Sequence, residues 1–120
     1  MRAHEYAVVL VTAPTGEAER LARLVIEREL AACVNLIPGV HSLYRWEGRL
    51  CEDAEVVLVI KTRLALVATL CEQLVAAHPY DLPEVIALPI VAGHGPYLQW
   101  LGAATAAGAG PDEQGSAATS

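Results

Sequence analysis

The chain has 120 residues, of which 54% are hydrophobic and 18% charged, and its formal net charge is −6. This length fits one domain around a single hydrophobic core. The negative charge excludes an electrostatic nucleic-acid binder, which needs a basic face, and the absence of phenylalanine leaves little material for base stacking. So much apolar surface on a small chain predicts that self-association buries part of it.

Nothing in the sequence predicts a membrane or secreted setting. No window approaches 18 uninterrupted apolar residues, and the start of the chain lacks the basic flank and apolar stretch of a signal peptide. The cysteines are odd in number and widely spaced, which does not fit a disulfide framework (Cys33, Cys51 and Cys71). A cytoplasmic location is therefore the expectation.

The first third of the chain reads as a strand followed by a helix. The β-rich run Tyr6–Thr12 predicts a buried strand. After a break, Thr15 is placed to cap a helix. Apolar residues recur at helical spacing from Ala18 to Cys33, with charged residues on the other side. This pattern predicts a one-faced helix lying on a sheet.

The middle of the chain predicts a long hairpin. Val34–Trp46 reads as one strand with a bulge or bend at Pro38-Gly39, which also indicates a sheet edge. Glu47-Gly48 forms the turn, and Cys51–Lys61 is the return strand.

A second helix and a last strand follow. Thr62 is placed to cap the helix, Val67, Cys71 and His78 share one of its faces, and Pro79 ends it. The fourth strand is Glu84–Val91, in which Pro89 again indicates an edge.

The chain then ends in a short helix and a tail. Pro96 begins the helix, and the composition beyond about Gly102 turns to Ala, Gly, Ser and Thr. The whole pattern predicts an α+β, ferredoxin-like βαββαβ sandwich with a long central hairpin. We assign residues 1–104 to this domain and 105–120 to a flexible tail.

The motifs of common enzymes and metal sites are absent. The sequence has no phosphate-binding glycine loop, no nucleophile elbow, no CxxC and no HxxxH. Cys71 and His78 are about 10 Å apart along a helix axis, too far to share one ion. The sequence therefore favours a protein that is not an enzyme.

His78 has two readings. In one, its ring satisfies the free carbonyls at the end of the second helix. In the other, it is a surface-accessible imidazole beside Tyr80, Asp81 and Glu84, suited to a divalent ion. The sequence leaves both open.

Lys61 and Trp46 are the other notable side chains. Lys61 lies within chain reach of acidic residues that include Glu55, and such a lysine usually reaches solvent or pairs with a carboxylate. Trp46 lies at the hairpin tip, where a neighbouring subunit is expected to cover it.

Several motifs resemble the CutA family of divalent-cation tolerance proteins. The match runs in order from about Val8 to Leu101; its motifs are Ala31-Ala32-Cys33-Val34-Asn35, Ser42-Leu43-Tyr44-Arg45-Trp46-Glu47-Gly48, Lys61-Thr62, His78-Pro79-Tyr80, Pro83-Glu84 and Tyr97-Leu98-Gln99-Trp100-Leu101. The resemblance implies a small cytoplasmic protein that forms a stable homotrimer through its hairpins and edge strands, with the architecture of PII signalling proteins. It also implies a link to copper and other divalent metals, and no established reaction.

The copper ligands proposed in that family match this chain at one position. They are a cysteine at the end of the first strand and two successive histidines before Pro-Tyr, where this chain has Val11 and Ala77-His78. The resemblance therefore implies that His78 is a metal ligand in a weak site for copper(II) or another divalent cation.

Two functions follow from the sequence. The first is a metal-binding tolerance protein that uses His78. The second is a PII-like sensor or scaffold whose intersubunit clefts bind a small anionic or amphipathic ligand or a partner protein. The residues expected at the cleft or interface are Trp46, Glu55, Lys61, Tyr80 and Glu84.

Overall fold

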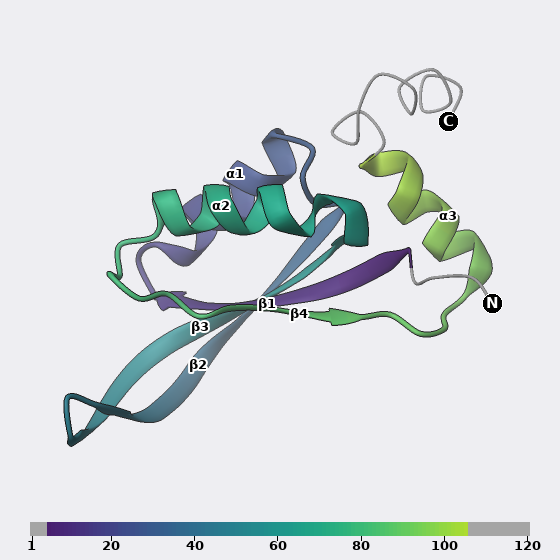
Figure 1. Ribbon diagram of the computed structural model, residues 1–120. Helices are drawn as coiled ribbons and strands as arrows, with labels where there is room; N and C mark the ends of the chain where they lie inside the picture. Colours follow the sequence, from purple (N-terminus) through teal and green to yellow (C-terminus); the bar gives the residue numbers. More distant parts are fainter. Residues whose placement is uncertain (1–4, 106–120) are drawn as a thin grey trace.

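The computed structural model describes residues 5–105 of the chain. Its elements are β1 (Tyr6–Pro14), α1 (Ala18–Glu27), β2 (Cys33–Trp46), β3 (Arg49–Arg63), a short 3-10 turn (Leu64–Leu66), α2 (Val67–Ala77), β4 (Val85–Pro89) and α3 (Gly95–Ala104). This order confirms the predicted βαββαβ arrangement with an added helix (Figure 1). The tail predicted over 105–120 lies, apart from Thr105, outside the described residues.

The sheet has the strand order β2-β3-β1-β4, and each neighbouring pair is antiparallel. β2 and β4 are therefore the edges, as the prolines predicted. The register of β2 shifts between Ile37 and Val40, which confirms the irregularity at Pro38-Gly39.

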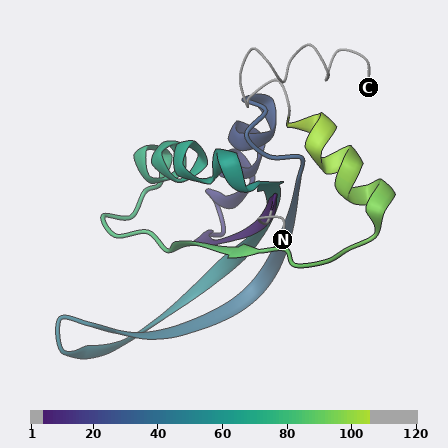
Figure 2. The ribbon, with the colours of Figure 1, turned by 45° about the vertical axis from the view of Figure 1, so that its right-hand side comes forward.

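One face of the sheet carries the core. Along β1 buried and half-buried residues alternate, so every second side chain points toward the helices. α1 and α2 lie side by side over this face (Figures 1 and 2). The core pairs fully buried strand and helix residues, among them Val9, Leu58, Ile60, Leu21, Val25, Leu70 and Leu74.

The other face is apolar and largely open. Ile37, Ile86 and Leu88 lie on it and are about half exposed. α3 packs at the end of the sheet where β3 ends, because the Arg63 guanidinium donates to the Gly102 carbonyl at 2.8 Å. The helices therefore leave a row of apolar side chains exposed on this face.

β2 and β3 extend well beyond the rest of the sheet as a two-stranded arm. β1 pairs with β3 only from Glu55 to Arg63, so the part of β3 before Glu55 is paired with β2 alone. At the tip, Glu47 and Gly48 both have positive φ, 51° and 78°, as a type I′ hairpin turn requires. The arm projects away from the helices (Figure 1) and gives the molecule a long axis of 50 Å.

α1 ends six residues earlier than predicted. The helix stops at Glu27, not Cys33, because Glu29 enters the left-handed region with φ 59°. The Leu30 N–H then bonds the Val25 carbonyl at 2.9 Å, the long bond of a Schellman motif. Leu30 is buried in the core, so it extended the apolar pattern without being helical.

Both predicted threonine caps are wrong. The N-cap of α1 is Glu17, which makes no side-chain capping bond, and Thr15 is exposed. Thr62 belongs to β3 and donates its hydroxyl to the Leu30 carbonyl at 2.6 Å. This bond ties the sheet to the chain leaving α1.

Candidate functional site

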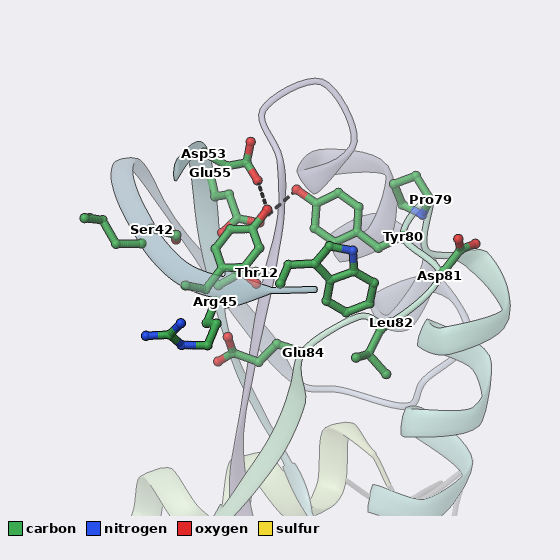
Figure 3. A pocket seen from close by; sticks show the side chains of 13 residues that line it. Thr12, Ser42, Arg45, Asp53, Glu55, Pro79, Tyr80, Asp81, Leu82 and Glu84 are labelled. Atoms are coloured by element: carbon green, nitrogen blue, oxygen red, sulfur yellow. Dashed lines mark hydrogen bonds between the residues drawn. The ribbon is translucent and has the colours of Figure 1, made fainter. Parts of the chain in front are cut away.

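A pocket of about 750 Å³ lies where the arm leaves the body of the molecule. The end of β1, both strands of the arm and the segment between α2 and β4 contribute to it (Figure 3). Its lining combines aromatic, acidic and small side chains: Thr12, Ser42, Leu43, Tyr44, Arg45, Trp46, Asp53, Glu55, Pro79, Tyr80, Asp81, Leu82 and Glu84.

Two tyrosine–carboxylate pairs form the wall on the arm side. The Tyr80 hydroxyl donates to Glu55 Oε2 at 2.8 Å, and the Tyr44 hydroxyl donates to Asp53 Oδ2. Asp53 and Glu55 are two residues apart on β3, so their side chains lie on the same face of the strand. Glu55 is only 5% exposed, so most of its side chain is covered by neighbouring residues.

Both phenols are held in their neutral form. The hydrogen bond to Asp53 raises the pKa of Tyr44 to about 12. Burial, followed by the hydrogen bond to Glu55, raises the pKa of Tyr80 above its ordinary value of 10.0. A phenolate in either position would face a carboxylate, so each hydroxyl remains a donor.

His78 is the residue that fixes this segment to β1. α2 ends at Ala77, and His78 has ψ 141°, the extended geometry expected before Pro79. Its Nε2 lies 2.8 Å from the Thr12 carbonyl, and its Nδ1 lies 3.1 Å from the amide nitrogen of Tyr80. Because a carbonyl accepts and an amide donates, Nε2 carries the proton and Nδ1 is the acceptor.

The expectation of a surface-accessible imidazole is therefore wrong. His78 is 8% exposed, both ring nitrogens have partners, and its ring lies 4.8 Å from the Tyr80 ring. The physical reason is that the extended turn at Pro79 directs the ring toward β1 and away from solvent. His78 thereby positions Tyr80 beside Glu55.

Four of the five residues expected at the cleft line the pocket together: Trp46, Glu55, Tyr80 and Glu84. Lys61 does not. It pairs with the Asn35 side chain and lies six residues from Glu55 on an extended strand, about 20 Å away. The expected reach of Lys61 to the acidic residues is wrong for the same reason.

The metal ligands expected from the sequence do not form a ready-made site. Among residues 5–105 no three His, Cys, Asp or Glu side chains are placed to hold one ion. Val11 is fully buried in the core, and the Nδ1 lone pair of His78 already accepts a hydrogen bond. The three cysteines are free thiols.

The sequence reasoning missed the contribution of Tyr44 and Asp53. Across the arm Ser42 pairs with Asp53 and Tyr44 with Cys51, so Tyr44 and Asp53 are diagonal neighbours on one face. The turn at Glu47-Gly48 fixes the register of the two strands. Counting residues back from this turn would have predicted that Tyr44 and Asp53 are neighbours.

The fold and the pocket define a ferredoxin-like α+β protein with a long hairpin arm, and the comparisons with known proteins agree. Residues 7–104 match the family described as CutA1 divalent ion tolerance protein. The chain belongs to this family. Within residues 5–105 no helix is both long and apolar enough to cross a membrane.

Individual relatives are similar over most of the chain. The chloroplastic protein CutA of Arabidopsis thaliana is 52% identical over 95 residues, which are 78% of this chain and 52% of that protein. The chain thus spans about half the length of this plant relative.

Solved structures of CutA proteins are also similar to this chain. The crystal structure of CutA1 from Oryza sativa is 50% identical, with a TM-score of 0.82 over 85% of this chain and 94% of that one. A PII-like protein CutA from Nostoc sp. PCC 7120 is 36% identical, with a TM-score of 0.79 over 82% and 96%.

Proposed function

We propose that this protein is a cytoplasmic, non-enzymatic homotrimer that binds copper(II) or another divalent cation and serves in divalent-cation tolerance. Membership of the CutA1 family supports the tolerance role. The free thiols Cys33, Cys51 and Cys71 suit a reducing compartment. Exposed apolar surfaces of this chain support the trimer, and the acidic lining of its pocket supports metal binding.

Three features support assembly. The open face of the sheet exposes apolar residues such as Ile86 and Leu88, no strand within residues 5–105 pairs with the outer edge of β2 or β4, and the arm carries Trp46, which is 44% exposed. Apolar faces and bare edges favour pairing with another chain. A trimer buries all three features in one closed assembly.

The charge of the pocket beside His78 is the observation that carries the metal proposal. Four carboxylates and one guanidinium line it, those of Asp53, Glu55, Asp81, Glu84 and Arg45. This excess of negative charge attracts divalent cations. Coordination at His78 Nδ1 must displace the Tyr80 N–H, so the site is weak.

A copper titration of matched variants tests this proposal. We expect His78→Gln to weaken copper(II) binding at least tenfold, which is about 1.4 kcal/mol, in isothermal titration calorimetry. His41→Gln is the control, since His41 lies exposed on the arm and pairs with Glu52. Equal loss in both variants, or none in His78→Gln, overturns the role of His78.

The pocket volume favours a second candidate function. At about 750 Å³ the pocket falls in the range of small-molecule sites and far exceeds the space of one ion. A PII-like sensor that binds a small ligand in this pocket is therefore the alternative. Lys61 does not line this pocket of the single chain, so an anionic ligand would depend on Lys61 lying in a cleft between subunits.

A further inference from the structure

Glu55 has a buried carboxylate with no cationic side chain paired to it among residues 5–105. The side chain is 5% exposed, and among the described residues its one side-chain hydrogen bond comes from the neutral Tyr80 hydroxyl. No Lys, Arg or His in residues 5–105 forms an ion pair with it. A buried carboxylate normally has a cationic partner, because its desolvation is costly.

Arg45 does not supply the missing charge. It lines the same pocket, yet its guanidinium points away from the carboxylates of Asp53 and Glu55 (Figure 3). The pKa of Tyr44 is raised mainly by its hydrogen bond to Asp53 and that of Tyr80 mainly by burial, and the nearby carboxylates of Asp53 and Glu55 add to both shifts.

The pocket also contains aromatic side chains next to its carboxylates. Tyr44, Trp46 and Tyr80 line the pocket together with Asp53 and Glu55. Aromatic faces attract cations through their quadrupole, most strongly where water is excluded. Carboxylates beside aromatic rings suit an organic cation that offers N–H donors and an apolar body.

We infer that this pocket binds a small organic ammonium ion, a protonated primary amine on a flat apolar body, with the ammonium at Glu55. This inference rests on the ligand-binding alternative proposed above, and not on copper. Such a cation can be held by one carboxylate and aromatic faces, so it does not need the three converging ligand side chains that residues 5–105 lack.

Three probes of matched shape and different charge test the inference. They are phenethylammonium, 2-phenylethanol and phenylacetate, titrated into the full-length Trp100→Phe protein, in which Trp46 is the one remaining tryptophan. We expect phenethylammonium to shift the Trp46 emission and to bind at least tenfold more tightly than the other two. If the alcohol or the acid binds as well as the amine, the pocket is a ligand site but the cation inference is wrong.

Two charge variants test whether the Glu55 carboxylate is responsible for amine binding. Glu55→Gln keeps an acceptor for the Tyr80 hydroxyl and removes the charge, so amine binding should fall at least tenfold. Glu72→Gln removes an exposed carboxylate of α2 outside the pocket lining and should leave binding unchanged. Equal binding in all three proteins overturns the role of Glu55. Absence of binding by every probe overturns both the inference and the ligand-binding role.

Discussion

At the scale of single residues, His78 holds two backbone segments together. It joins the Thr12 carbonyl of β1 to the Tyr80 amide through its two ring nitrogens, and this holds the Tyr80 hydroxyl against Glu55. A chain of bonds thus runs from the first strand to the arm. The pocket depends on this chain, because its members come from three separate segments.

The Tyr80–Glu55 bond makes a measurable contribution to stability. Tyr80→Phe leaves the buried Glu55 without its donor, and we expect a loss of about 2 kcal/mol, the range for hydrogen bonds to charged groups. Urea unfolding of Tyr80→Phe, Glu55→Ala and the double variant measures it. Additive losses in the two single variants would show that the pair is not coupled.

The same bond predicts the pH dependence of stability. The pKa of Tyr80 is raised in the folded protein, so its contribution is complete below the unfolded value of about 10 and is lost as pH rises through the raised pKa. The wild type should therefore lose its advantage over Tyr80→Phe only above pH 10. A difference that already disappears near neutral pH contradicts this assignment.

At the scale of elements, the end of α1 carries an avoidable strain. Glu29 occupies the left-handed C′ position with φ 59°, where glycine is favoured. Glu29→Gly should raise the free energy of unfolding by about 1 kcal/mol. Glu27→Gly, at the last helical residue of α1, should lower it, by less than the cost of about 1 kcal/mol for glycine in a helix interior. Thermal unfolding compares the two, and the same sign in both variants would contradict the Schellman geometry.

Element order and sheet edges followed from the sequence, whereas helix ends and side-chain directions did not. Runs rich in Val, Ile and Leu located the strands, and Pro38 and Pro89 marked the edges correctly. The end of α1 was predicted too late, because Leu30 is a buried residue after the helix that continues its apolar pattern. The burial of His78 depends on the turn at Pro79 and on a carbonyl of β1, which no local pattern specifies.

At the scale of the whole molecule, the open sheet face is the surface that most needs a partner. Leu88 is 49% exposed there, so Leu88→Glu should leave the single chain folded and disrupt the assembly. Val75→Glu, on the exposed side of α2, is the matched control and should remain assembled. Sedimentation velocity distinguishes them, and an assembled Leu88→Glu protein would exclude this face as the interface.

Native mass spectrometry with and without stoichiometric copper(II) tests the central claim most directly, because it reports assembly and ion count together. The account predicts a species of three times the 12.7 kDa chain mass that takes up a fixed number of ions. A single-chain mass would contradict the assembly. A trimer without copper, or with an undefined number of ions, would contradict the metal-binding role and leave the pocket beside Tyr80 as the functional site.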